Sequence, residues 1–364
     1  AWAVCPAAWA ERTSIEPLLS SFIIFYFIQN SSCLNFSVRE NGTKTKQKII
    51  ILLRREPLMQ RKLLMKGKVK EAYDLGDRLE FLFTDNISVF DKVIPTQIPF
   101  KGETLSREGV YWFDRAARMG IKTHFLEHLP PAGMLCRKVD ILQPSQITPQ
   151  SKNYLIPLEW ICRWYVAGSL YDRVKEGKLS ARDLGYPSGH KVKLGEPLPE
   201  PFLEVSTKLE KTDRLLKKDE ALQISGLSAQ EYNQARETVL RIDEDMGRSV
   251  SSRGLIHADG KKELAFDEYR QIMVIDVYGT ADEDRFWDKA RYEAGELVDL
   301  SKEYVRQHYR QIGYKDRLYA AREAGRMEPE IPALPPEVVA QTSRIYIRLF
   351  EMITGEAFLP SGRI

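Results

Sequence analysis

The sequence predicts an α+β fold with two lobes, and three observations lead to this prediction. The chain has 364 residues, which is long enough to build two lobes around sizeable cores. Its apolar fraction of 43% excludes collagenous and fully disordered classes of protein. Strand-like patterns dominate before residue 170, whereas helical patterns dominate after residue 228. We therefore expect strands and helices to be segregated along the chain, with a cleft between the lobes.

The first half of the chain is expected to be rich in strands. Leu79, Phe81 and Phe83 alternate with other residues, which is the period-2 pattern of a strand. A helix is predicted next, with Thr104 as its N-cap and Gly120 at its end. The other predicted elements of this half are strands over 134–142 and 160–166 and a long Pro- and Gly-rich surface loop over 185–206.

The second half is expected to alternate between helix and strand. Ser228 and Glu231 form a capping box, which predicts the start of a helix. Its apolar stripe consists of Tyr232, Ala235, Val239, Ile242 and Met246. A final helix is predicted from the pair Pro335-Pro336 to Gly355. The remaining predictions are strands over 254–258 and 272–278 and a long polar helix from Asp284 to Gln311.

The net charge of +3 lies entirely in the first 58 residues. That segment holds seven Lys or Arg and four Glu, so the rest of the chain is neutral. A neutral body argues against a nucleic-acid partner, because phosphate backbones are bound by a basic surface. We expect residues 1–58 to be a disordered or non-native extension, residues 59–158 to form a β-rich N-terminal lobe, and residues 159–364 to form an α+β C-terminal lobe.

Short apolar runs and sparse cysteines bear on the cellular compartment. The run 22–28 is too short for a membrane span, which needs about 20 apolar residues, so no membrane partner is expected. Cys136 and Cys162 are the only cysteines after residue 58, and this predicts a reducing, cytoplasmic compartment. The five histidines show no metal-ligand spacing, so a zinc site is not expected.

The turn Gly67-Lys68-Val69-Lys70 is a candidate phosphate-binding loop. A glycine in such a turn lets backbone N–H groups approach a phosphate, and the flanking lysines neutralise its charge. A solvated basic hairpin is the alternative interpretation of the same residues.

Arg163 is a charged residue within a mostly apolar predicted strand, six residues before Ser169. An arginine in this setting needs an anionic partner. That partner is either a ligand such as a phosphate or a carboxylate of the protein, and the sequence leaves both open.

The segment Asp259-Gly260-Lys261-Lys262-Glu263, followed by Asp276, contains the most informative cluster of charges. Two neighbouring strands would bring Glu263 and Asp276 to one place. Paired carboxylates beside lysines fit a Mg²⁺–nucleotide site, since Mg²⁺ takes oxygen ligands and phosphates. A surface ion-pair cluster is the alternative.

Taken in order, these segments resemble the phosphoribosylaminoimidazole-succinocarboxamide synthase (SAICAR synthetase) family, from about Met65 to Gly355. The matching motifs are GKVKEAY at 67–73, TDNISVFD at 84–91, KG at 101–102, RWYVAGS at 163–169, STK at 206–208, DGKKE at 259–263 and DxxRFW at 282–287. The chain departs from the family pattern after Asp276, where a common Glu is missing and one residue is added, and it is shorter after Lys208.

The resemblance implies a two-lobed α+β fold of antiparallel sheets and helices, related to ATP-grasp and kinase-like proteins, with ATP bound between the lobes. It implies a ligase that joins L-aspartate to the carboxylate of 5-aminoimidazole-4-carboxylate ribotide (CAIR), with ATP and Mg²⁺ as cofactors and a homo-oligomer left open. A carboxylate is a poor acyl donor, so ATP would first convert it to an acyl phosphate. A kinase-like phosphotransferase is the alternative, but the H-R-D motif that it predicts is absent.

The resemblance also implies roles for individual residues. The ATP-binding residues would be Gly67, Lys68, Val69, Lys70, Glu263 and Asp276, with Glu263 and Asp276 also holding the metal. The catalytic residues would be Lys208, Lys261 and Asp276. The substrate-binding residues would be Asp91, Lys101, Arg163, Ser169, Asp213, Asp282 and Arg285.

Overall fold

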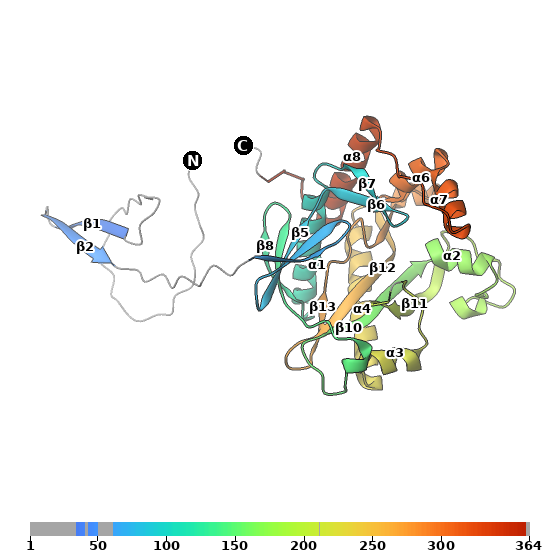
Figure 1. Ribbon diagram of the computed structural model, residues 1–364, viewed down its shortest axis with the longest axis horizontal. Helices are drawn as coiled ribbons and strands as arrows, with labels where there is room; N and C mark the ends of the chain where they lie inside the picture. Colours follow the sequence, from blue (N-terminus) through green and yellow to red (C-terminus); the bar gives the residue numbers. More distant parts are fainter. Residues whose placement is uncertain (1–33, 41–42, 50–60, 211, 362–364) are drawn as a thin grey trace. The chain divides into compact units, whose positions relative to one another are not determined.

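The computed structural model describes residues 34–40, 43–49, 61–210 and 212–361. The chain divides into two compact units, Ala1–Met59 and Gln60–Ile364 (Figure 1). In the first unit, strands β1 (Leu34–Glu40) and β2 (Thr43–Ile49) pair antiparallel. Most of the extension predicted over 1–58 lies outside the described residues, so that expectation stays a prediction.

The second unit begins with an antiparallel sheet in the order β3-β4-β5-β9-β8. Its strands are β3 (Lys62–Lys66), β4 (Lys70–Asp74), β5 (Arg78–Phe83), β8 (Phe125–Leu129) and β9 (Gly133–Arg137), and β6 (Asn86–Val89) pairs separately with β7 (Lys92–Gln97). The predicted alternating strand is β5, and its Phe81 and Phe83 are buried. The strand predicted over 134–142 is shorter, since β9 ends at Arg137.

Helix α1 (Lys101–Arg118) lies against this first sheet and starts earlier than predicted. Thr104 is not its N-cap, because its hydroxyl donates to the Lys101 carbonyl inside the first turn. The Asp85 carboxylate instead accepts from the Gly102 N–H at 2.9 Å. A side chain at Gly102 would lie 2.6 Å from the Phe83 carbonyl, so glycine lets the helix start against β5.

The second sheet has the order β11-β10-β12-β13, and β14 pairs with β12. Its antiparallel strands are β10 (Leu155–Tyr165), β11 (Pro197–Thr207), β12 (Leu255–Phe266), β13 (Ile272–Ile275) and β14 (Arg285–Asp288). One face of this sheet packs against a long helix, α4 (Ala229–Ser251), through apolar side chains such as Trp160 and Leu264. The combination of helices with antiparallel sheets confirms the predicted α+β class.

Two predictions about irregular and helical segments are wrong. The loop predicted over 185–206 contains β11, which pairs with β10 at Pro197 and from Phe202 to Thr207. Proline is tolerated there because β11 lies at the edge of the sheet. The long helix predicted from Asp284 to Gln311 is divided into β14, α5 (Lys289–Glu293) and α6 (Glu303–Gln311), because pairing with β12 holds its first residues extended.

The other helices follow the sequence patterns more closely. Helix α4 has the predicted capping box, with the Glu231 N–H donating to Ser228 Oγ, and its predicted stripe is buried. The last helix, α8 (Pro336–Thr354), ends at Gly355 as expected and lies at one end of the unit with α6 (Figure 1). The remaining helices are α2 (Gly168–Lys175), α3 (Lys218–Ser225) and α7 (Tyr314–Glu323). Among the described residues, no helix combines the length and apolar character needed to cross a membrane.

Candidate active site

One face of the second sheet carries a ladder of charged side chains. The register places Glu159 of β10 opposite Glu263 of β12, and Arg163 opposite Asp259. Directly opposed residues of antiparallel strands point to the same side, and so do residues two apart along one strand. The intervening residues, Trp160 and Cys162, are buried on the other face, toward α4.

The two predicted metal carboxylates meet at the edge of this ladder. Glu263 is paired with Ile275 of β13, so Asp276 follows directly after its partner. Burial and the charge of Asp276 raise the pKa of Glu263 to about 7. Burial also opposes ionisation of Asp276, but the ammonium group of Lys70 holds the pKa of Asp276 well below its usual range. The sequence expectation that neighbouring strands bring these two carboxylates together is met in the geometry.

Lys70 joins the first sheet to this carboxylate pair. It is the first residue of β4, and its Nζ forms an ion pair with Asp276 Oδ1. The ammonium also lies 4.6 Å from the centre of the Phe81 ring. The preceding turn is held by the Gly67 N–H, which donates to the Lys70 carbonyl at 2.8 Å, and a side chain at Gly67 would lie 2.8 Å from that oxygen. The candidate phosphate loop is thereby fixed beside the carboxylates.

Two further lysines cross the ladder. Lys208 Nζ lies 3.0 Å from Glu159 Oε1 and 2.5 Å from Glu263 Oε1. Lys261 Nζ lies 3.3 Å from the same Glu159 oxygen and 3.2 Å from Glu283 Oε2. Burial opposes the charge of Glu159, but the ammonium groups of Lys261 and Lys208 lower its pKa. Both lysines remain partly accessible, so phosphate oxygens could replace their carboxylate partners.

The arginines form a second cluster at the other end of the ladder. Arg163 and Arg285 share Asp259, whose Oδ2 lies 3.2 Å from Arg163 Nη1 and 2.6 Å from Arg285 Nη1. Arg163 Nη2 also donates to Ser169 Oγ at 3.3 Å. Gly168 approaches Arg285 closely, since a side chain there would lie 2.9 Å from Nη2. Arg163 also pairs with Glu204 at 3.1 Å and Arg285 with Asp299 at 3.3 Å, so an anion bound here would compete with these carboxylates for the two guanidinium groups.

Lys101 and Asp282 are buried against each other. Lys101 Nζ lies 2.8 Å from Asp282 Oδ2, and the two side chains are 0% and 3% exposed. Lys302 and Tyr346 complete the shell around Asp282, at 3.2 Å and 2.7 Å. The pair joins the start of α1 to the segment before β14 and to α8, and its predicted contact with substrate stays a prediction.

The last two predicted site residues lie near the surface. Asp91 lies in the segment that follows β6, and its Oδ1 forms an ion pair with Lys68 Nζ at 2.8 Å. Asp213 is exposed and interacts electrostatically with Glu159, Lys261 and Lys208, which places it beside the ladder. The predicted residues therefore gather around one sheet face, apart from the buried pair Lys101–Asp282.

Sequence reasoning missed several residues of this face. Glu159 and Asp259 are the shared carboxylates of the two clusters, yet neither received a role. An apolar patch next to Glu263 was also missed, and it consists of Leu155, Ala265, Met273 and Ile275, with Val139 and Leu209 packed against them. The continuous apolar run of residues 272–275 just before Asp276 was a usable signal.

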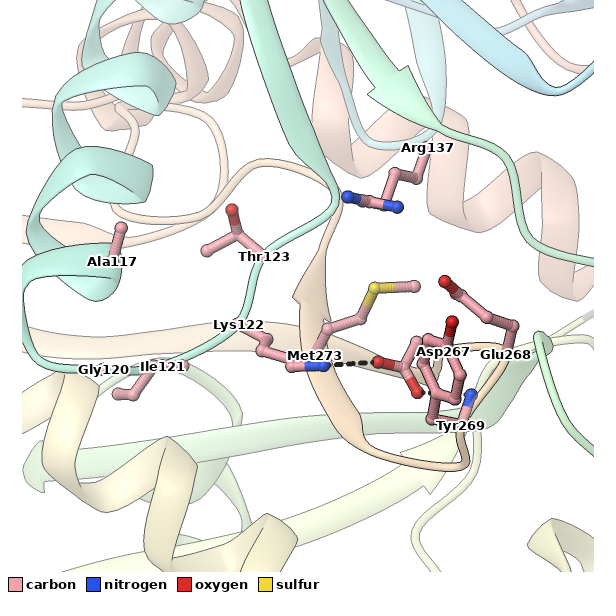
Figure 2. Close-up of a pocket in the computed structure, with 10 residues that line it drawn as sticks. All are labelled: Ala117, Gly120, Ile121, Lys122, Thr123, Arg137, Asp267, Glu268, Tyr269 and Met273. Carbon is pink, nitrogen blue, oxygen red and sulfur yellow. Dashed lines mark hydrogen bonds and ion pairs between the residues drawn. The ribbon is translucent and has the colours of Figure 1, made fainter. Parts of the chain in front are cut away.

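A cavity of about 450 Å³ lies next to Met273 of the apolar patch. It is lined by the end of α1, the segment that follows it, Arg137 and the turn after β12. In Figure 2, Lys122 contacts Asp267 across this cavity, with Glu268 and Tyr269 beside them. None of the predicted site residues lines it, but Met273 belongs both to its wall and to the apolar patch beside Glu263.

Comparison with known proteins assigns a family to this arrangement. The family model described as SAICAR synthetase matches residues 63–320. The chain belongs to the SAICAR synthetase family. Relatives named phosphoribosylaminoimidazole-succinocarboxamide synthase include one from Thermoplasma acidophilum, which is 53% identical over 295 residues, or 81% of this chain and 99% of the relative. A putative synthase from Archaeoglobus fulgidus is 32% identical, with 82% of this chain and 96% of the relative covered.

Solved structures of SAICAR synthetases share the fold. The SAICAR synthase of Saccharomyces cerevisiae, solved as a complex with SAICAR, matches with a TM-score of 0.63 at 24% identity and covers 82% of this chain and 96% of its own. A SAICAR synthetase in complex with ADP matches with a TM-score of 0.58 at 23% identity, over 81% of this chain and 99% of that one. The family match identifies the chain as a ligase of purine biosynthesis and does not support the kinase-like alternative.

Proposed function

We propose that this SAICAR synthetase family member joins L-aspartate to the carboxylate of CAIR, with ATP converted to ADP and phosphate. The observation that carries the proposal is the charged sheet face, on which carboxylates and lysines lie beside a glycine turn and an arginine pair. The products of this reaction bear phosphates and carboxylates. A face with several exchangeable ammonium and guanidinium groups suits such ligands.

ATP would lie between the glycine turn and the ladder. The phosphates would contact the backbone of Gly67 to Lys70 and the ammonium groups of Lys68, Lys70 and Lys208. The purine base would rest on the apolar patch around Met273 and Ile275, which is next to the carboxylate pair on the same face. The relative solved with ADP supports nucleotide binding in this fold.

The carboxylate pair fits a magnesium ion. Glu263 and Asp276 supply oxygen donors from adjacent strands, and the raised pKa of Glu263, caused by burial and by the charge of Asp276, indicates that a further cation would be favourable there. When bound, Mg²⁺ would neutralise charge on the phosphate oxygens of the nucleotide. Lys70 and Lys208 would then turn from these carboxylates toward the phosphates.

The arginine cluster would hold the phosphate of the ribotide. Arg163, Arg285 and Ser169 gather at Asp259, and a phosphate bound there would compete with this carboxylate. It would also compete with Glu204 and Asp299, which pair with Arg163 and Arg285 in turn. Asp259 of the arginine cluster and Glu263 of the carboxylate pair lie on the same strand, β12, with Lys261 between them. In the proposed complex, this spacing would bring the imidazole carboxylate of the ribotide near the γ-phosphate of ATP.

The chemistry would proceed in two steps on this face. An oxygen of the CAIR carboxylate attacks the γ-phosphorus, the bond to the β-phosphate oxygen breaks, and ADP leaves from an acyl phosphate. The aspartate amine then attacks the acyl carbon, the bond to the phosphate oxygen breaks, and the amine proton passes to solvent or the departing phosphate. Lys208 and Lys261 would stabilise the charge that develops on the transferred group, and the rest of the rate would come from positioning.

The remaining proposals concern compartment, lobes and assembly. A cytoplasmic enzyme fits a role in purine biosynthesis and two free, buried cysteines, Cys136 and Cys162. The boundary between the lobes is proposed at residues 158–159, which lies within β10. A homo-oligomer is also proposed, and light scattering of the purified chain would test it by measuring the molar mass in solution.

The proposed activity is tested by measuring ADP release with each substrate omitted in turn. Release should require both CAIR and L-aspartate, and the product should have the mass of SAICAR. ADP formation that continues at the same rate without aspartate would contradict the proposal. Arg163→Ala should raise the KM for CAIR by about tenfold or more, with little change in the KM for ATP. An effect confined to ATP would assign the arginine another role.

A further inference from the structure

Three ion pairs in succession fasten the segment before β14 to strand β12. Asp259 pairs with Arg285 at 2.6 Å, Lys261 with Glu283 at 3.2 Å, and Lys262 with Asp284 at 2.9 Å. The first two lie on the charged face, where substrates compete for the same groups. The third lies on the opposite face of β12 and is fully buried. One side of the strand is therefore accessible to ligands while the other holds a permanent contact.

The buried pair Lys262–Asp284 belongs to a cluster in which both carboxylate oxygens of Asp284 have hydrogen-bond partners. Its Oδ2 lies 2.9 Å from Lys262 Nζ and 2.7 Å from His257 Nε2, and its Oδ1 accepts from the Gly279 N–H at 2.9 Å. Lys262 Nζ also lies 2.9 Å from Asp243 Oδ1 of α4. The side chains of Lys262, Asp284 and Asp243 are completely inaccessible to solvent. The cluster thus links the segment 279–284 to both β12 and α4.

Gly260 gives independent support for the importance of this contact. A side chain at Gly260 would lie 1.8 Å from Asp284 Oδ2 and 2.2 Å from its Cγ. No L-residue with a Cβ fits at this distance, so glycine is required for Asp284 to reach the strand. Alternate residues of the DGKKE segment therefore serve opposite faces of β12. Asp259, Lys261 and Glu263 lie on the charged face, whereas Gly260 and Lys262 accommodate Asp284.

The cluster resembles a cation site in which an ammonium group is the cation. Asp243, His257 and Asp284 offer ligand atoms within 4.8 Å of one another, the spacing of a small metal site. No spacing in the sequence indicates this cluster, because its members lie on α4, on β12 and in the segment before β14. Lys262 Nζ lies 2.9 Å from an oxygen of Asp243 and 2.9 Å from an oxygen of Asp284, so its positive charge neutralises these carboxylates as a metal ion would.

We propose that Lys262, Asp284, Asp243 and Gly260 are positioning residues that keep Arg285 and Glu283 in place while substrates displace their partners on β12. The inference rests on the proposed function, in which Arg285 binds the ribotide phosphate. When that phosphate draws Arg285 away from Asp259, the neighbouring bond from Asp284 to Lys262 is unaffected. The backbone of Arg285 then stays in place. Little of the binding energy of the phosphate is therefore lost in ordering the segment that precedes the arginine.

The test uses two variants that remove the anchor in different ways. Gly260→Ala pushes Asp284 away without changing any charge. The triple variant Lys262→Met/Asp243→Asn/Asp284→Asn removes the ammonium group and both buried carboxylates together, so that neither side of the ion pair is left without its partner. The matched control is Asp245→Asn, which lies two residues from Asp243 on α4 and breaks an ion pair with Arg115 at 2.8 Å. Each protein is examined by hydrogen exchange, thermal unfolding and steady-state kinetics.

We expect amide exchange over residues 277–285 to become about tenfold faster in both anchor variants and to stay unchanged in the control. The KM for CAIR should rise about tenfold, whereas the KM for ATP should stay within about twofold. Wild-type exchange and an unchanged KM for CAIR in a folded triple variant would overturn the proposal. So would failure of both anchor variants to fold, which would assign the cluster to core stability alone. The wild type could lack aspartate-dependent turnover while the anchor variants still show faster exchange. That result would refute the proposed function and support the anchor.

Discussion

The ion pairs on the two faces of the second sheet differ in their access to solvent. On the charged face, the lysines that contact Glu159 are 26% and 36% exposed. The pair Lys262–Asp284 on the opposite face is 0% exposed, and Lys101–Asp282 is nearly as buried. The partly accessible lysines can exchange a protein carboxylate for a ligand phosphate, whereas the fully buried lysines lose too much on separation to do so. The first group is suited to binding and the second to holding the elements that bind.

Removing the cation of a buried pair should have the largest effect on stability. Lys101→Met leaves Asp282 buried with only Lys302 and Tyr346 as partners. The free energy of unfolding should fall by about 3 kcal/mol, because the buried carboxylate keeps only one of its two ammonium partners. Urea unfolding followed by circular dichroism measures the change.

The double variant Lys101→Met/Asp282→Asn is the control for this prediction. It removes both charges of the pair and should recover part of the lost stability, since the cost comes from a buried carboxylate that has lost one of its two ammonium partners. A single variant as stable as the wild type would show that burial does not distinguish this pair from those on the charged face.

Neutralising a carboxylate on the charged face should instead remove activity and spare the fold. Glu263→Gln should lower turnover by about 10²–10³-fold, the usual cost of losing one charged group at a reacting centre. Its stability should be equal to or above that of the wild type near pH 8, because burial and Asp276 already disfavour the charged form.

Glu268→Gln is a matched control on the turn after β12, since Glu268 is exposed and outside the charged face. Turnover by the control should equal that of the wild type. A Glu263→Gln protein that keeps full turnover, or that loses as much stability as Lys101→Met, would remove the distinction between the two groups of charges.

His124 sharpens the comparison because it is a buried ionisable group whose Nε2 has no hydrogen-bond partner. Burial lowers its pKa from 6.5 to about 3. Between these values the unfolded chain binds a proton that the folded protein does not, so stability rises with pH and is lost as the pH falls below 6.5. The wild type should lose about 2 kcal/mol from this group between pH 6.5 and pH 5, at about 1.4 kcal/mol for each pH unit.

His124→Leu should remove this part of the acid sensitivity. Urea unfolding at pH 5 and pH 7 gives the difference directly for both proteins. The aromatic rings of Phe81 and Phe113 lie 5.8 Å and 5.4 Å from the imidazole, so a leucine keeps an apolar neighbour for them. An equal pH dependence in the two proteins would mean that His124 is protonated in the folded state.

The sequence predicted the strand alternation, the capping box of α4 and the proximity of Glu263 to Asp276, because each depends on local spacing. It failed for β11 and β14, since both are extended only through pairing with a neighbouring strand. Glu159 and Asp259 were missed for the same reason. Their role appears only when the register of β10 and β12 places them opposite other charges. Local pattern therefore identifies the charged motifs, while sheet register decides which charges share a partner.

The smallest effect on stability is expected at the most exposed ion pair of the site, Lys68–Asp91. Their side chains are 49% and 78% exposed, and pairs of this kind contribute about 0–1 kcal/mol. Lys68→Met should therefore change the free energy of unfolding by less than about 1 kcal/mol. If Lys68 contacts the phosphates of ATP, the KM for ATP should nevertheless rise several-fold, and the rise should shrink at high salt because exposed charges are screened. Asp91→Asn breaks the same pair but keeps the lysine, so a matching rise in the KM for ATP would contradict the assigned role of Lys68.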